Sequence, residues 1–178
     1  VNYGVVTGAL IGEYQIKNTN TILCAIRELG ITDVEAVKKG FLNVVQLTGL
    51  MGRWQILCNQ PLIVCDTGHN VGGWKYLSKQ INHQECHQKH IVFGMVDDKD
   101  IDSVMELLPK DAIYYWSQAT THRAIPSQVV AQKGLAHGLV GRVYDRVESA
   151  YMAALANAVP DDFVFIGGSS YIVTDLLP

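Results

Sequence analysis

The residues best suited to chemistry gather in a short polar loop. Residues 66–70 read Asp-Thr-Gly-His-Asn and directly follow the apolar, partly β-branched run of residues 61–65. Beyond the loop, Trp74, Leu77 and Ile81 have helical spacing, so the pattern predicts a buried strand that feeds a helix. Polar groups at the carboxyl end of such a strand are where α/β proteins bind ligands. An acid, an imidazole and an amide therefore indicate a small-molecule site here.

Three more polar loops follow apolar segments further along the chain. They cover residues 97–100, 120–123 and 167–170 and contain aspartate, lysine, histidine, arginine and serine. In a parallel sheet the segments that follow the strands meet at one edge, so we expect these loops to lie near residues 66–70. Because loops are polar in any fold, this grouping alone leaves open whether the edge is a functional site.

Several known catalytic signatures are missing. The sequence has no GxxxxGK[ST] phosphate loop, no GxGxxG after a strand and no GxSxG turn. A dinucleotide enzyme and a serine hydrolase are therefore poorly supported. Residues 167–170, Gly-Gly-Ser-Ser, could present backbone N–H groups to an anion, but the same residues are also ordinary turn and cap chemistry.

Two clusters contain metal-ligand residue types. One could be drawn as a zinc site and consists of His83, Cys86, His87 and His90. Structural zinc ligands usually come as pairs from separate elements, so a solvated helix end is the simpler interpretation. The aspartates in residues 97–100 could hold Mg²⁺, but acids at a helix N-terminus are explained equally well by the helix dipole. We assign no metal ligand from the sequence.

Alternating strands and helices are expected to position these loops. Strands are predicted at residues 54–57, 62–65, 90–95, 112–116, 139–144 and 163–166. Helices are predicted from residue 72, from residue 100, and over residues 127–133, 147–158 and 170–177. Strands separated by helices favour a Rossmann-like α/β domain, in which helices cover both faces of a mostly parallel sheet.

The segment before this domain has a helical pattern. Apolar residues in 18–30 recur at i, i+3, i+4 and i+7, and Thr32 with Glu35 forms a capping-box pattern for a second helix. Residues 47–52 contain two glycines and have no clear period.

These patterns predict a division of the chain into three parts. They are a helical unit over residues 1–46, a hinge linker over residues 47–52 and the α/β domain over residues 53–178.

Composition limits the class of protein. The chain has 178 residues, of which 48% are hydrophobic and 17% charged, and its net charge is -3. We therefore predict no binding to nucleic acid, and no apolar run approaches the roughly 20 residues that a membrane span needs. The four cysteines have no paired CxxC spacing, which is typical of free thiols in a reducing compartment, so we expect a cytoplasmic protein. The first residue is Val1, not Met, which favours a fragment of a longer chain.

Six short motifs stand in order along the chain. They are Gly-Glu-Tyr-Gln-Ile-Lys-Asn at residues 12–18, Gly-Arg-Trp-Gln at 52–55, residues 66–70, Gly-Met-Val-Asp-Asp-Lys-Asp at 94–100, His-Arg-Ala at 122–124 and Gly-Ser-Ser-Tyr at 168–171. The ordered set resembles the C-terminal part of the folylpolyglutamate synthase and dihydrofolate synthase family, a branch of the Mur ligase superfamily. The first motif resembles the end of that family's central ATP-binding domain.

The resemblance implies an ATP-dependent amide ligase. In this family ATP phosphorylates a carboxylate of a pteroate or folate, and the amino group of glutamate attacks the acyl phosphate. The phosphate loop and the Mg²⁺ ligands belong to a central domain that would precede Val1. This chain is then a fragment without catalytic residues of its own, and its partner is the missing N-terminal part of the same polypeptide.

Two other functions remain open at this point. One is a Mur-type ligase for another amino acid, and the other is a stand-alone α/β module that binds a nucleotide or metabolite without catalysis. The helical unit before the hinge argues against the module, since a free-standing module has no use for the end of another domain.

Four residues match family positions near the nucleotide. Asn18 matches the residue that approaches adenine in this family, and an amide can both donate to and accept from a purine edge. A helix N-cap is the alternative role. Arg53 matches a hinge arginine that reaches toward phosphate, and an interdomain ion pair is its alternative. Asp66 and His69 match the pair that faces ribose and phosphates, although Asp66 could instead be a strand-end turn residue.

Four other residues match the glutamate side of the family's site. Lys99 matches the lysine that neutralises a substrate carboxylate, and Ser169 or Ser170 would hydrogen-bond the same substrate. Helix capping is the alternative for either serine. Arg123 could serve the substrate side chain or a structural ion pair. Tyr14 departs from the family, which usually has histidine at that position.

Overall fold

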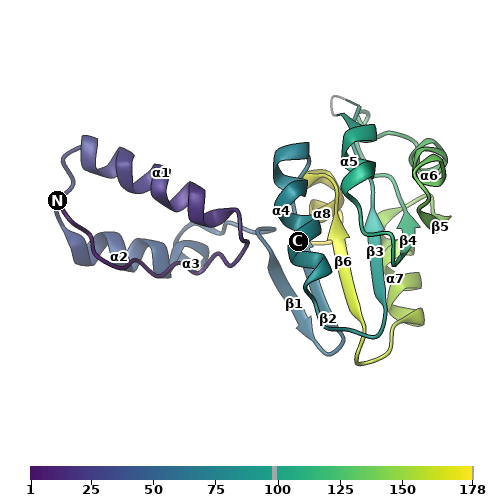
Figure 1. Cartoon of the computed structure of the whole chain (residues 1–178), viewed down its shortest axis with the longest axis horizontal. Coiled ribbons are helices and arrows are strands. Elements are labelled where there is room, and N and C mark those ends of the chain that lie inside the picture. Colours follow the sequence, from purple (N-terminus) through teal and green to yellow (C-terminus); the bar gives the residue numbers. More distant parts are fainter. Residues whose placement is uncertain (98–99, 178) are drawn as a thin grey trace.

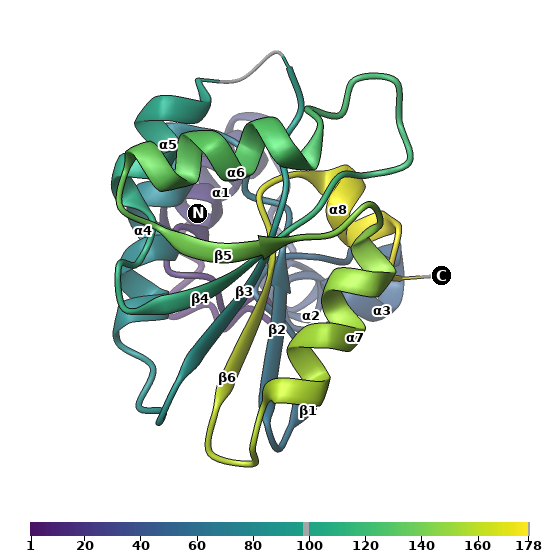
Figure 2. The same cartoon turned by 90° about the vertical axis from the view of Figure 1, so that its right-hand side faces the viewer.

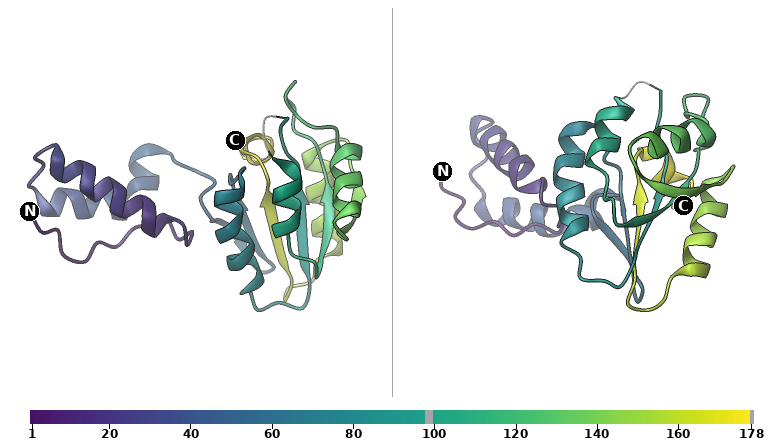
Figure 3. Two further views of the ribbon diagram at one scale, coloured as in Figure 1. Left: turned by 45° about the horizontal axis from the view of Figure 1, so that its top comes forward. Right: turned by 45° about the vertical axis from the view of Figure 1, so that its right-hand side comes forward.

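The chain folds into an N-terminal helical arm, residues 1–52, and a C-terminal α/β domain (Figure 1), in a computed structural model that describes residues 1–97 and 100–177. Figure 3 shows in two further views that the arm extends away from one side of the domain. The candidate site lies where the two parts meet.

The arm is helical, as its sequence pattern predicts. Its helices are α1 (Gln15–Glu28), α2 (Val34–Leu42) and α3 (Val44–Thr48). The predicted capping box of Thr32 and Glu35 is wrong, because Asp33 is the N-cap of α2 and its carboxylate accepts from the N–H of Ala36 at 3.0 Å. The helix begins one residue later than the pattern placed it, and a carboxylate caps the same backbone donors as a hydroxyl. The first residues of the predicted linker belong to α3, and no helix or strand covers residues 49–54.

A six-stranded sheet forms the centre of the domain. Its strands are β1 (Gln55–Asn59), β2 (Leu62–Asp66), β3 (Lys89–Phe93), β4 (Ala112–Trp116), β5 (Val140–Val143) and β6 (Phe163–Gly167). Their order is β1-β2-β6-β3-β4-β5, and every neighbouring pair is parallel except β1 and β2. These two are antiparallel because only Gln60 and Pro61 connect them, too short a link for a parallel crossover.

Helices cover both faces of this sheet (Figure 2), which confirms the predicted α/β class. They are α4 (Val71–Asn82), α5 (Ile101–Leu107), α6 (Ser127–Ala136), α7 (Val147–Asn157) and α8 (Ser170–Thr174). Residues of α4, α5 and α6 pack on one face and residues of α7 and α8 on the other. Along β6, Phe163 and Phe165 belong to the first core, while Val164 and Ile166 belong to the second. In the described part of the chain, no helix has the length and apolar character needed to cross a bilayer.

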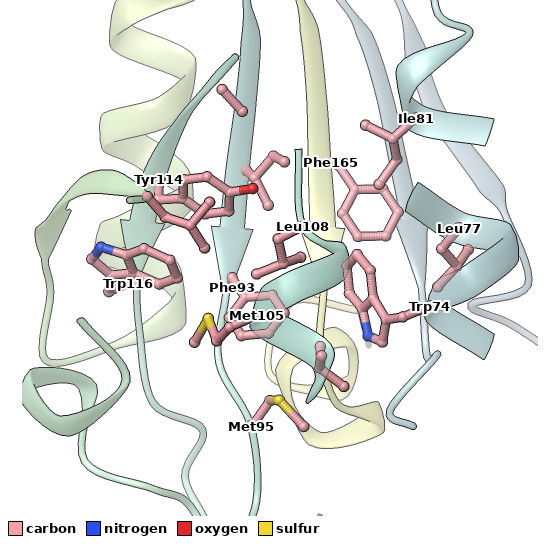
Figure 4. Packing of buried hydrophobic residues seen from close by; sticks show 14 of the residues in the cluster. Trp74, Leu77, Ile81, Phe93, Met95, Met105, Leu108, Tyr114, Trp116 and Phe165 are labelled. Carbon is pink, nitrogen blue, oxygen red and sulfur yellow. The ribbon is translucent and has the colours of Figure 1, made fainter. Parts of the chain in front are cut away.

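Aromatic residues dominate the core beneath α4 and α5 (Figure 4). The indole of Trp74 packs edge-on against Phe93 and Phe165, with ring centroids 5.6 and 5.7 Å apart. Tyr114 and Trp116 stack on each other at 4.5 Å. Because such a core is close-packed, it holds the carboxyl ends of β2, β3 and β6 in fixed register. The loops that follow these strands therefore start from a rigid base.

Candidate functional site

Asp66 accepts hydrogen bonds from both the arm and the domain. It ends β2, and its side chain is fully buried. Oδ2 accepts from the Tyr14 hydroxyl at 2.7 Å and from the Trp54 N–H at 2.6 Å, while Oδ1 accepts from the Gly68 N–H at 2.7 Å. Burial raises the pKa of this carboxyl, although the three donors and the nearby Arg53 guanidinium act in the opposite direction. Neither carboxylate oxygen is exposed to accept from a ribose hydroxyl in this arrangement. Asp66 instead connects Tyr14, Trp54 and Gly68 through its hydrogen bonds.

The backbone that enters the domain has an unusual conformation. Trp54 has a φ of 49° and is the one non-glycine residue with positive φ among the described residues. Its N–H bond to Asp66 and the stacking of its indole on Phe163, with centroids 6.3 Å apart, stabilise this conformation. The preceding residue, Arg53, donates from its guanidinium to the hydroxyl of Thr67 in the loop after β2.

A cavity of about 320 Å³ lies between α1, the loop after β2 and the start of α4. Its lining includes all four residues that the sequence assigned to a nucleotide, namely Asn18, Arg53, Asp66 and His69. Asn18 and Arg53 also border a neighbouring cavity of about 400 Å³ within the arm. The fold therefore brings together residues from the arm, the hinge and the loop after β2.

Asn18 borders this cavity from inside α1. The helix begins at Gln15, whose N–H donates to the Gly12 carbonyl at 2.8 Å. The exposed Asn18 amide donates to Oε1 of Gln15 at 3.0 Å. The alternative role of Asn18 as an N-cap is therefore wrong, because the helix starts one turn earlier than its apolar pattern indicates.

The loop after β2 is ordered by its own hydrogen bonds. His69 Nδ1 lies 3.0 Å from the Thr67 carbonyl oxygen. Since a carbonyl can only accept, Nδ1 carries the proton and Nε2 is the nitrogen left for other contacts. Asn70 caps α4 by accepting from the Gly73 N–H at 2.9 Å. The N-terminus of α4, with its partial positive charge, therefore borders the cavity.

The charged side chains of the cavity rim are cationic apart from the enclosed Asp66. Arg53 lies on the hinge side and Lys17 on the arm side. The ammonium of Lys17 also lies 5.2 Å from the centroid of the Tyr76 ring, a cation–π contact that links α1 to α4. Two cationic groups and a helix N-terminus around one cavity suit an anionic ligand such as a phosphate chain.

The described residues assigned to glutamate, Ser169, Ser170 and Arg123, follow strands further along the sheet edge. Ser169 is buried and caps α8, because its hydroxyl accepts a backbone N–H at 3.2 Å, whereas Ser170 is exposed. The structure thus separates two serines that the sequence could not. The Nε atom of Arg123 lies 3.9 Å from the Asp97 carboxylate, which matches the ion-pair alternative. Lys99 lies outside the described residues.

Strand order places these loops side by side. Because β6 lies between β2 and β3, the loop after β6 is flanked by the loops after those two strands. The approach is close at Gly168, where a Cβ would lie 2.4 Å from the carbonyl oxygen of Gly94. Asp66 and His69, assigned to the nucleotide, therefore lie at the same edge of the sheet as Ser169 and Ser170, assigned to glutamate.

The histidine-rich segment is not arranged as a zinc site. His90 is buried, with Nε2 3.1 Å from Oδ2 of Asp162 and Nδ1 2.9 Å from the Tyr115 hydroxyl. His87 Nδ1 lies 3.5 Å from the other Asp162 oxygen.

In the aspartate cluster, Asp100 caps α5 by accepting a backbone N–H at 3.1 Å. Within residues 1–97 and 100–177, no group of three or more His, Cys, Asp or Glu side chains could hold a metal ion.

Sequence reasoning missed three residues of this site. Tyr14 was recognised only as a departure from a family pattern, and its hydroxyl is the arm's direct link to Asp66. Lys17 lies in the same motif, but nothing in its spacing indicated the cavity. Trp54 contributes through its backbone N–H, which a sequence does not distinguish from any other.

The fold is an α/β domain whose sheet edge, together with a helical arm, borders a cavity with cationic side chains. Residues 52–170 match the family model described as "Mur ligase, glutamate ligase domain", so the chain belongs to the Mur ligases. The particular branch follows from its relatives. Dihydrofolate synthase/folylpolyglutamate synthase of Escherichia coli (strain K12) is 30% identical over 162 residues, which are 90% of this chain and 37% of that protein.

Two solved structures agree with this assignment. E. coli FolC in complex with DHPP and ADP has a TM-score of 0.82 at 26% identity and covers 97% of this chain and 40% of its own. The bifunctional folylpolyglutamate synthase/dihydrofolate synthase of Yersinia pestis, complexed with AMPPNP and Mn ion, has a TM-score of 0.67 at 26% identity, with coverages of 82% and 34%. The predicted family is confirmed, and the chain spans well under half the length of these relatives.

Proposed function

We propose that this chain is the C-terminal part of an ATP-dependent ligase that adds glutamate to dihydropteroate, to folates or to both. The observation that carries this proposal is the cavity between the arm and the loop after β2. Asn18, Arg53, Asp66 and His69 all line it, although they come from distant parts of the sequence. The named relatives, whose solved structures include ADP, DHPP and AMPPNP, support the choice of ligands.

In the proposed reaction, a substrate carboxylate receives the γ-phosphoryl group of ATP and becomes an acyl phosphate. The amino group of glutamate then attacks the acyl carbon, phosphate leaves, and an amide bond forms. This chain contributes charge and position rather than a covalent step. Arg53 and Lys17 offset the negative charge of the phosphates, and Asn18 meets the adenine edge.

In this proposal Asp66 does not contact the ribose directly but orders the residues around it. Its enclosed carboxylate orders Trp54, Gly68 and Tyr14, and this order presents His69 and Arg53 to the cavity. The ribose and phosphate contacts are then made by His69 Nε2 and by the Arg53 guanidinium.

We assign the glutamate side to the neighbouring loops. Ser170 is the exposed serine and therefore the better donor to a substrate carboxylate, while Ser169 caps α8 beside it. Lys99 and Arg123 are the proposed cationic partners of the two glutamate carboxylates. Arg123 would then exchange its contact with Asp97 for the substrate.

The cationic rim of the cavity suits the phosphates of a nucleotide. The described residues contain no group of side chains that could bind Mg²⁺. The Mn ion named with the Yersinia pestis structure supports a divalent metal in the complete enzyme. We assign its ligands to the part of the polypeptide outside this chain.

We also propose that the enzyme works in the cytoplasm. Its cysteines, Cys24, Cys58, Cys65 and Cys86, are all free thiols. Free cysteines are typical of reducing compartments. Immunodetection of the protein in cell fractions tests this location, and recovery from an oxidising compartment would contradict it.

The proposed reaction is tested with the full-length protein. Phosphate release should depend on ATP, on dihydropteroate or a folate, and on glutamate together. Arg53→Ala is expected to raise the KM for ATP about tenfold, because a charge-assisted contact is lost. Arg142→Ala is the matched control, since Arg142 is exposed on β5 at the far edge of the sheet. Wild-type protein without glutamate-dependent phosphate release would refute the function, and equal KM values in both variants would refute the role of Arg53.

A further inference from the structure

Tyr14 joins the arm to the domain in a way that no other described arm residue does. It stands at the N-terminal end of α1, directly before Gln15, and its ring packs against the core of the domain. Its hydroxyl donates to Oδ2 of Asp66 at 2.7 Å. The same carboxylate accepts from the N–H groups of Trp54 and Gly68, so one buried acid connects the arm, the hinge and the loop after β2.

Other contacts between arm and domain exist, but they involve neutral acceptors or exposed groups. The Glu13 N–H donates to Oε1 of Gln80 at 2.9 Å, and Nε2 of Gln80 donates to the Ile11 carbonyl at 3.3 Å. The Lys17 ammonium lies over the Tyr76 ring. The bond from Tyr14 differs from these contacts because its acceptor is a fully buried carboxyl group that also binds the hinge and the loop after β2.

We propose that Tyr14 is a positioning residue for the nucleotide cavity: its hydroxyl holds the first turn of α1 against the loop after β2, so that Asn18 and His69 border one ligand. The identity of that ligand as a nucleotide rests on the proposed function. Tyr14 also lines the cavity, but its hydroxyl is bound to the buried Asp66 and therefore acts through the placement of its neighbours.

The structure predicts a specific consequence of removing this hydroxyl. In Tyr14→Phe the ring keeps its packing, and Asp66 keeps its backbone donors from Trp54 and Gly68. The domain therefore stays folded, while the N-terminal end of α1 loses its hydrogen bond to Asp66. The two sides of the cavity no longer hold a fixed separation, so part of the nucleotide-binding energy is used to order them.

The test measures ADP binding to the full-length protein by titration calorimetry. Tyr14→Phe is expected to raise the Kd for ADP about tenfold, because about 1.4 kcal/mol of the binding energy is then used to order the two sides of the cavity. Tyr3→Phe is the matched control, because the Tyr3 hydroxyl donates to the Ile31 carbonyl at 2.7 Å entirely within the arm. It removes a tyrosine hydrogen bond of the same length that does not reach the domain, and it should leave the Kd within twofold of wild type.

The outcomes separate this proposal from the proposed function. Equal ADP affinity in wild type and Tyr14→Phe overturns the positioning role, as does a wild-type protein that binds no ADP. Steady-state kinetics add a second criterion, since the KM for ATP should rise in Tyr14→Phe while the KM for glutamate stays unchanged; equal rises overturn the proposal. A tenfold loss of ADP affinity in a protein that releases no phosphate supports the role of Tyr14 and refutes only the ligase function.

Discussion

Gly168 offers a sharp test of how the shared sheet edge is built. It follows β6 with a φ of +100°, and a Cβ at this position would lie 2.4 Å from the Gly94 carbonyl oxygen and 2.9 Å from the Phe93 ring. Gly168→Ala therefore adds both backbone strain and overlap with a backbone atom that cannot turn aside. Gly138 provides a matched comparison, because its φ is +74° and a Cβ there meets nothing within 4 Å.

The two contributions can be separated in magnitude. Placing alanine in the left-handed region costs about 1–2 kcal/mol, and this is the whole expected effect of Gly138→Ala. Overlap in a packed region adds about 1–3 kcal/mol. Gly168→Ala should then lower the free energy of unfolding by about 2–5 kcal/mol, and the difference between the two variants is the steric part.

Urea unfolding followed by tryptophan fluorescence measures both variants. The tryptophans, Trp54, Trp74 and Trp116, are all buried in the α/β domain and report its unfolding. Unchanged m-values would show that only stability differs between the variants. If Gly168→Ala destabilises no more than Gly138→Ala, the loops after β3 and β6 do not approach as closely as the structure has them, and the reasoning fails.

Two further results are expected. Burial raises the pKa of Asp162, but backbone N–H donors and His90 outweigh it and hold that pKa below the ordinary aspartate value. The stabilisation from Asp162 is then present above roughly pH 4 and lost as the pH falls through the lower folded-state pKa, so Asp162→Asn should flatten the acid limb of stability against pH; an unchanged limb would contradict this. In the full-length enzyme, Lys99→Ala should raise the KM for glutamate much more than that for ATP in steady-state assays, and equal rises would contradict its assigned role.

Much of the α/β domain could be predicted because its signals are local. Apolar runs such as residues 62–65 and 163–166 mark strands on their own, and the helical spacing of Trp74, Leu77 and Ile81 marks α4. Polar residues at the ends of those strands predicted the edge of the sheet at which the candidate site lies. Signals at element boundaries are weaker, because several residues near a helix start can cap it. The start of α1 and the cap of α2 were missed for that reason.

The sequence by itself determined the alternation of strands and helices, the edge where polar loops gather and the family, since each rests on residue types at short spacing. Only the tertiary structure decided that Asp66 is enclosed, that Tyr14 and Trp54 bind it, and that Ser170 rather than Ser169 is exposed. Tyr14 stands far from Asp66 in the chain, and their contact depends on how the arm docks on the domain. Burial and long-range hydrogen bonds are properties of that packing, which no local pattern records.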